Sequence, residues 1–184
     1  MKVIERALNG VILIEPRVFT DSRGYFFETF QVEKYAEIGI ECSFVQDNLS
    51  RSVKNTIRGM HYQIQPYSQG KLCQVVQGEV LDVALDIRYG SPTYGKHYIT
   101  NLSESNHRQL WIPPGFAHGF LVLTDVAVFN YKCTKLYNNS SERTILYNDA
   151  DLAIPWNCES PVLSDKDLLG TRFKDIARDF TFGE

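Results

Sequence analysis

A chain of 184 residues is long enough for one domain with a sizeable core, and we expect that domain to span residues 1–184. Hydrophobic residues make up 43% of the chain and charged residues 22%, as in an ordinary globular protein. The net charge of −3 excludes the broad basic surface that holds nucleic acid, and no apolar run is long enough to cross a membrane. Glu5 and Arg6 lie where a signal peptide needs an apolar stretch, so we expect a cytoplasmic protein.

Patterns near the N-terminus predict short extended segments and one short helix. We expect extended chain at Val11–Glu15, Tyr25–Phe30 and Ser43–Asn48. Val32–Ile38 is a candidate helix, because Gly39 follows it as a good C-cap.

The middle of the chain shows the period of two that is typical of strands. In VLDVALDI, residues 80–87, four aliphatic residues share one parity, and Asp82, Ala84 and Asp86 share the other. This alternation predicts a strand whose aliphatic face is turned toward a core. A strand at Leu72–Gln77 precedes it, joined by a hairpin turn at Gly78.

The second half predicts more strands and two helical pieces. The expected strands are Gln109–Ile112, Phe120–Leu123 and Val126–Thr134, and the first is halted by Pro113-Pro114-Gly115. Helical pieces are expected at residues 164–169 and 173–179. Many short strands and few helices predict an all-β sandwich or barrel, and a jelly roll is the architecture we expect.

Two motifs suggest a barrel that has lost a metal site. PPGFAHGF, residues 113–120, has the shape of the second motif of cupin barrels, P-x-G-x-x-H. A metal-binding cupin would carry an earlier H-x-H pair and a carboxylate, but RGMHYQ places Gln63 where the second histidine would be. Since a firm metal site needs three or four suitable ligands, we expect no metal. The four cysteines form no CxxC pair, so we expect reduced and mostly buried thiols.

The remaining candidates suit proton transfer and anion binding. His61 and His118 lie inside apolar or aromatic stretches, where a histidine is either a satisfied core residue or a general base. His97 and His107 lie beside turns and are expected to be solvated. A strand at VFNYKCT would place Tyr131, a candidate acid, on one face with its alternate neighbours.

Arginine and lysine beside turn-like stretches complete this set of candidates. Arg23, Arg58 and Lys71 could meet an anionic ligand, although each one taken singly fits a solvated surface residue better.

Taken together and in order, the motifs DSRGYFFETF, FVQDNLSRS, IRGMHYQ, QGKL, VLDVALDIR, GSPTYG, QLWIPPGFAHGF, YKCT and LSDKD resemble the dTDP-4-dehydrorhamnose 3,5-epimerase family over about residues 1–170. The resemblance implies a double-stranded β-helix, or jelly roll, with a few short peripheral helices. It also implies a homodimer that works without a metal or other cofactor. Its substrate would be a dTDP-4-keto-6-deoxyhexose, inverted at carbons 3 and 5 for dTDP-L-rhamnose biosynthesis.

The resemblance also implies roles for individual residues. His61 matches the base, Asp167 its carboxylate partner, Tyr131 the acid on the opposite face, and Lys71 the cation near the enolate oxygen. The positions that match substrate contacts are Arg23, Glu28, Gln46, Asn48, Arg58, His118, Glu142 and Lys166, with Tyr137 stacking on thymine. Asp167 also fits a capping box that begins at Ser164, and the two roles are compatible.

Several alternatives stay open at this stage. Leu136, Met60 and the segment PWNCESP depart from the common family pattern, which leaves the nucleotide and sugar preference open. Relatives act on GDP-heptoses or amino-deoxy sugars, or invert one carbon, and a ketoisomerase would keep the same fold. A non-catalytic sugar-binding cupin would be expected to lack His61, Tyr131 or Lys71, and all three are present.

Overall fold

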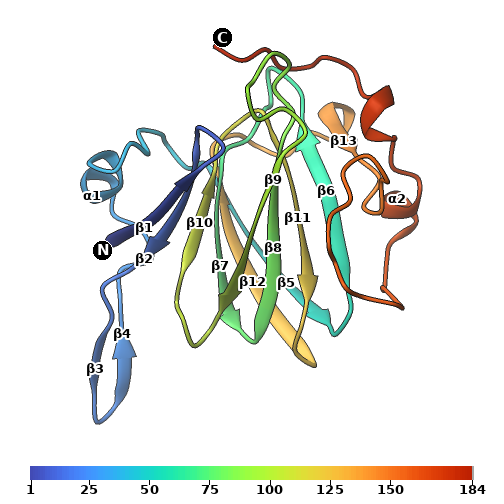
Figure 1. The fold of residues 1–184 in the computed structure, drawn as a ribbon. Helices are drawn as coiled ribbons and strands as arrows, with labels where there is room; N and C mark the ends of the chain where they lie inside the picture. Colours follow the sequence, from blue (N-terminus) through green and yellow to red (C-terminus); the bar gives the residue numbers. More distant parts are fainter. Residues whose placement is uncertain (184) are drawn as a thin grey trace.

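In the computed structural model, which describes residues 1–183, two antiparallel sheets pack face to face as a jelly roll (Figure 1). The larger sheet has the strand order β1-β2-β10-β7-β12-β5, and the smaller one β13-β6-β11-β8-β9. Their bounds are β1 (Lys2–Ala7), β2 (Val11–Glu15), β5 (Gln46–Val53), β6 (Ile57–Gln63), β7 (Lys71–Gln77), β8 (Glu79–Asp86), β9 (His97–Ser103), β10 (Gln109–Ile112), β11 (Phe116–Val122), β12 (Val126–Cys133) and β13 (Glu142–Thr144). The predicted all-β jelly roll is confirmed.

Smaller elements lie around the sandwich. A two-stranded hairpin, β3 (Phe19–Asp21) and β4 (Gly24–Phe26), projects away from it (Figure 1). The helices are α1 (Val32–Ala36) and α2 (Asp165–Leu168), with single 3₁₀ turns at Asn139–Ser141 and Phe173–Asp175. No helix within residues 1–183 is long and apolar enough to cross a membrane.

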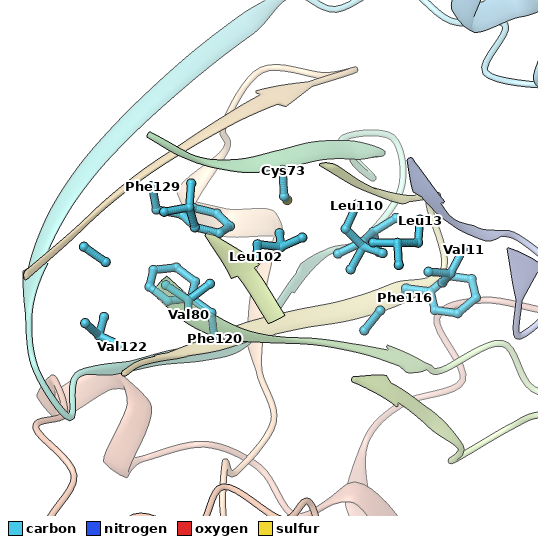
Figure 2. Close-up of a cluster of buried hydrophobic side chains, with 14 residues drawn as sticks. Val11, Leu13, Cys73, Val80, Leu102, Leu110, Phe116, Phe120, Val122 and Phe129 are labelled. Carbon is cyan, nitrogen blue, oxygen red and sulfur yellow. The ribbon is translucent and has the colours of Figure 1, made fainter. Parts of the chain in front are cut away.

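Apolar side chains of both sheets fill the interior between them. Figure 2 shows Phe120 and Phe129 from facing sheets, together with Val80, Leu102 and Leu110. The rings of Phe120 and Phe129 stack with centroids 4.3 Å apart. Stacked aromatic pairs add to the stabilisation that burial of their area provides, so this pair ties β11 to β12.

The C-terminal segment covers the outer face of the smaller sheet. Ile145, Leu152 and Trp156 are buried against Val83 and Leu85 of β8. Figure 1 shows this segment in orange and red along the outside of β6. It places α2 against β6, and so brings residues from the end of the chain to the middle of the sheet.

The outer layer buries β8 on both faces. The aliphatic face with Val83 and Leu85 packs in a core, as the alternation in VLDVALDI predicted, and the face that carries the aspartates is buried as well. Asp82 and Asp86 are each 0% exposed. Asp86 accepts hydrogen bonds from Arg88, Ser91 and Thr93, which satisfy a carboxylate that would otherwise be costly to bury.

Other predicted boundaries shift by a few residues. The strand expected at 120–123 begins at Phe116, because the chain resumes extended pairing directly after Gly115. Of the segment expected at 25–30, only the part in β4 is a strand, and the strand expected at 43–48 is shifted toward the C-terminus as β5. The two helical pieces expected near 164–179 are single turns. The prediction of solvated histidines is wrong, since His97 lies half-buried on β9 and His107 packs on the Tyr25 ring.

Close packing between β6 and β11 depends on Gly59. A Cβ atom at this position would lie 2.4 Å from Gly119 Cα and 2.8 Å from the carbonyl oxygen of His118. The φ angle of Gly59 is +136°, a value that L residues rarely adopt. Glycine therefore lets the two strands that carry His61 and His118 approach each other.

We predict that Gly59→Ala destabilises the fold more than Gly24→Ala does. Gly24 has a similar φ of +128°, but a Cβ atom added there would meet nothing within 4 Å, so both variants share backbone strain of about 1–3 kcal/mol. Only Gly59→Ala adds the overpacking term, which is about 1–3 kcal/mol. Urea unfolding measures both free energies, and equal losses would contradict the proposed close contact.

Candidate active site

A cleft of about 300 Å³ lies between the two sheets. Its walls come from β6 and β11 on one side and from β5, β7 and β12 on the other. Polar and aromatic side chains dominate the lining, which consists of Ser50, Arg58, His61, Tyr62, Gln63, Gln69, Lys71, His118, Phe120, Tyr131, Tyr137, Glu142 and Lys166.

A short hydrogen bond joins His61 of this cleft to Asp167. His61 Nε2 lies 2.6 Å from Asp167 Oδ1, and the side chain of Asp167 is only 4% exposed. Asp167 Oδ2 accepts a hydrogen bond from Ser164 Oγ at 2.6 Å, within a capping box that starts α2. The capping role and the pairing role predicted for Asp167 therefore coexist in one carboxylate.

Burial keeps His61 in its neutral form at neutral pH. Desolvation lowers the pKa of His61 below its ordinary value of 6.5, and the hydrogen bond to Asp167 opposes that shift only in part. Burial works to raise the pKa of Asp167, but the hydrogen bonds from His61 and Ser164 outweigh it and lower the pKa. The pair is thus a neutral imidazole oriented by a carboxylate, the arrangement of a general base.

Tyr131 enters the cleft from the opposite sheet. It lies on β12, beside Cys73 of β7, and packs against Phe129 with ring centroids 6.0 Å apart. Burial raises its pKa to about 12, so its phenol keeps the proton at neutral pH. The Lys71 ammonium lies 5.9 Å from the centre of the Tyr131 ring. A candidate base and a candidate acid therefore face the same cleft from different sheets.

His118 and Arg58 line the same wall as His61. His118 pairs directly with His61 in the β6–β11 register, and Arg58 pairs with Phe120. Arg58 Nε donates to Ser52 Oγ at 3.0 Å, which holds the guanidinium in place. His118 Nε2 lies 3.1 Å from each carboxylate oxygen of Asp82.

The mouth of the cleft is a connected polar network. Lys166 Nζ donates to Glu142 Oε1 at 2.8 Å, and the Tyr137 hydroxyl donates to Glu142 Oε2 at 3.0 Å. The pKa of Glu142 is lowered, because hydrogen bonding and the charge of Lys166 outweigh its burial. Gln46 accepts from the Tyr137 backbone N–H and donates to Asn48. Gln46 and Asn48 thus support the loop that carries Tyr137.

Two predicted site residues lie away from the cleft. Arg23 pairs with Asp21 on the β3–β4 hairpin, and Glu28 pairs with Lys34 of α1. Figure 1 shows that hairpin on the far side of the sandwich from β6 and α2. Within a single chain, the structure does not bring Arg23 and Glu28 to the other predicted residues.

Several cleft residues escaped prediction from the sequence. Ser50, Gln63 and Phe120 line the cleft, as do Tyr62 and Gln69. Strand parity was the available signal, since Ser50 continues the face of Gln46 and Asn48, and Phe120 that of His118. Among residues 1–183, no group of three or more His, Cys, Asp or Glu side chains is arranged to hold a metal ion.

Comparison with known proteins finds a match over most of the chain. The family model described as dTDP-4-dehydrorhamnose 3,5-epimerase matches residues 5–175. A protein of that name from Shigella flexneri is 51% identical over 176 residues, which cover 95% of this chain and 97% of that protein.

Solved structures give the same result in three dimensions. The Legionella pneumophila 3,5-epimerase RmlC, in complex with dTDP-4-keto-L-rhamnose, has a TM-score of 0.93 at 49% identity, covering 96% of this chain and 94% of that one. ChmJ, a 3′-monoepimerase from Streptomyces bikiniensis in complex with dTDP-quinovose, has a TM-score of 0.85 at 32% identity, covering 90% and 84%.

We predict that Asp167→Asn lowers the pKa of His61 further. In the native protein the Asp167 hydrogen bond raises this pKa against a larger desolvation effect, so removing the carboxylate leaves desolvation less opposed. The ring should then take up its proton only at a lower pH than in the native protein. A ¹H NMR titration of the His61 Cε1–H signal measures both values, and an unchanged or raised pKa in the variant would contradict the pairing.

Proposed function

Since the chain belongs to the dTDP-4-dehydrorhamnose 3,5-epimerase family, we propose that its cleft inverts carbons 3 and 5 of dTDP-4-keto-6-deoxy-D-glucose. The enzyme is an epimerase of the isomerase class, and the reaction serves dTDP-L-rhamnose biosynthesis. The observation that carries the proposed mechanism is the placement of the His61–Asp167 pair and Tyr131 on opposite sheets around one cleft.

Proton abstraction begins at His61. The 4-keto group acidifies the hydrogens on both neighbouring carbons, and the neutral imidazole takes one of them. Asp167 holds Nε2 and stabilises the imidazolium that forms, so that Nδ1 acts on the substrate. The electron pair of the broken C–H bond forms an enolate with its negative charge on the C4 oxygen.

Stabilisation of the enolate and return of the proton need two further groups. Lys71 supplies a positive charge from the larger sheet near the developing oxyanion, an effect commonly worth a few kcal/mol. Tyr131 donates its phenolic proton to the carbon from the face opposite His61, which inverts the centre. The raised pKa of Tyr131 keeps that proton available until the enolate accepts it.

The nucleotide part of the substrate is assigned to the mouth of the cleft. Tyr137 offers an exposed ring for stacking on thymine, and Lys166 and Arg58 offer positive charge for the diphosphate. Gln46 and Asn48 of β5 support the loop that carries Tyr137, and Glu142 accepts hydrogen bonds from both Tyr137 and Lys166. These residues support binding, whereas His61 and Tyr131 perform the chemistry.

A homodimer is the assembly we propose. Arg23 and Glu28 match substrate-contacting positions but lie outside the cleft of their own chain, so a second copy would have to supply them. The hairpin that carries Arg23 exposes Phe19, Tyr25 and Phe26, as an element that packs against another surface would do.

The proposal also includes a single domain, a reaction without a metal and a cytoplasmic location. We propose a single domain over residues 1–184, supported by the C-terminal segment that covers the smaller sheet and delivers Asp167. A reaction without a metal is supported by the donor set, because no group of three or more His, Cys, Asp or Glu side chains within residues 1–183 is arranged around one point as metal ligands would be. The cytoplasmic location stays a prediction from the sequence.

One alternative has support from a specific observation. ChmJ, which has a similar structure, is described as a 3′-monoepimerase, an enzyme that inverts a single carbon. The same residues would then act at one centre only. The number of carbons that exchange hydrogen decides between these two reactions.

We predict that His61→Ala strongly slows hydrogen exchange at the sugar. In D2O with native protein, dTDP-4-keto-6-deoxyglucose should take up deuterium at carbons 3 and 5, and NMR of the sugar measures this uptake. His61→Ala should lose about 10²–10⁴-fold in the exchange rate, because a general base contributes that much. His97→Ala is the matched control, since His97 is also half-buried on a strand but does not line the cleft.

Exchange at a normal rate in His61→Ala would remove His61 as the base. In the native protein, exchange at one carbon would support the monoepimerase alternative, and exchange at neither would mean a different substrate.

A further inference from the structure

A second imidazole–carboxylate pair lies beside the first. His118 Nε2 is 3.1 Å from both Oδ1 and Oδ2 of Asp82, so one N–H group faces the two oxygens evenly. A protonated carboxyl group would instead use one oxygen as a donor. The even contact is the geometry of an ionised carboxylate that accepts a hydrogen bond from the ring.

The surroundings of Asp82 leave His118 as its partner. Asp82 is 0% exposed, and among the hydrogen bonds of residues 1–183 only His118 donates to its side chain. The neighbouring Cys73 thiol, 3.9 Å from Nε2, is neutral because burial raises its pKa. A buried carboxylate without a cation costs several kcal/mol. Asp167 also accepts hydrogen bonds from the backbone N–H and Oγ of Ser164, whereas Asp82 has the His118 ring alone, which favours a positive charge on His118.

His118 is placed to act on the reacting part of the substrate. It is the direct cross-strand partner of His61, and such partners lie side by side on one face of the sheet. It also lines the cleft, and no hydrogen bond within the described part of the chain engages its Nδ1. The C4 oxygen is bonded to the carbon between the two reacting centres, so a group beside the base on the cleft wall is within the region where that oxygen would bind.

We propose that Asp82 is a positioning residue that keeps His118 protonated on both ring nitrogens, so that Nδ1–H donates to the substrate oxygen that becomes the enolate. This inference rests on the proposed function for the identity of that oxygen. His118 then acts with Lys71 from the opposite sheet, and the two fixed positive charges stabilise the same developing oxyanion. The two adjacent histidines have different tasks: His61 is neutral and takes protons, whereas His118 is charged and holds the oxygen.

A ring-nitrogen NMR spectrum tests the charge of His118 without any substrate. The chain has 4 histidines, and His118→Gln identifies the signals of His118 in ¹⁵N-histidine-labelled protein. At pH 7 we expect both of its ring nitrogens to show shifts of the protonated form. Neutral-form shifts for His118 in the native protein would overturn the proposal, whether or not any variant folds.

Asp82→Asn tests the positioning role. The amide keeps the shape of the carboxylate but removes its charge, so the His118 ring should change to a neutral tautomer. We expect kcat to fall about 100-fold or more with KM nearly unchanged, because a group that acts on the enolate contributes mainly in the transition state. A raised KM with unchanged kcat would instead assign His118 to ground-state binding and would overturn the proposal.

Asp86→Asn is the matched control. Asp86 lies on the same strand and is equally buried, but its partners are Arg88, Ser91 and Thr93 rather than a cleft residue. It should lower stability while leaving the His118 signals and kcat unchanged. Equal effects of both substitutions on the His118 ring would mean that Asp82 has only a structural role. If native protein does not turn over dTDP-4-keto-6-deoxyglucose, the proposed function fails, yet the spectrum still decides the charge of His118.

Discussion

The hydrogen bond between His61 and Asp167 joins parts of the chain that are 106 residues apart. It requires the C-terminal segment to pack across the smaller sheet, because only then does α2 reach β6. The same packing excludes water from the back of His61 and so lowers the pKa of the ring. The layer that covers the smaller sheet thus also sets the environment of the proposed base, so the same segment contributes to packing and to the pKa of His61.

In the proposed mechanism, the two sheets divide the chemical work between them. The smaller sheet carries His61 and His118, each backed by a buried carboxylate, and the larger sheet carries Tyr131 and Lys71. A sugar ring bound between the sheets would turn one face toward His61 and the other toward Tyr131. Inversion needs that separation, since a proton removed from and returned to the same face would restore the starting configuration.

The sequence predicted the jelly roll and most of the cleft, because strand alternation and the ordered motifs are local signals. It did not predict that β8 is buried on both faces, since the covering layer comes from residues far along the chain. For the same reason the pattern placed Asp82 on a polar face and did not indicate it as the partner of His118. Arg23 and Glu28 are the reverse case. The family motifs predicted them as substrate contacts, but within one chain neither residue lines the cleft.

If a base and an acid act from opposite sheets, Tyr131→Phe should separate removal of the proton from inversion of the carbon. With dTDP-4-keto-6-deoxyglucose in D2O, the variant should still wash in some deuterium through His61 while inversion collapses. Tyr98→Phe is the control, because Tyr98 packs on the same core but its hydroxyl donates to Glu5. Inversion at the native rate in Tyr131→Phe would contradict the account.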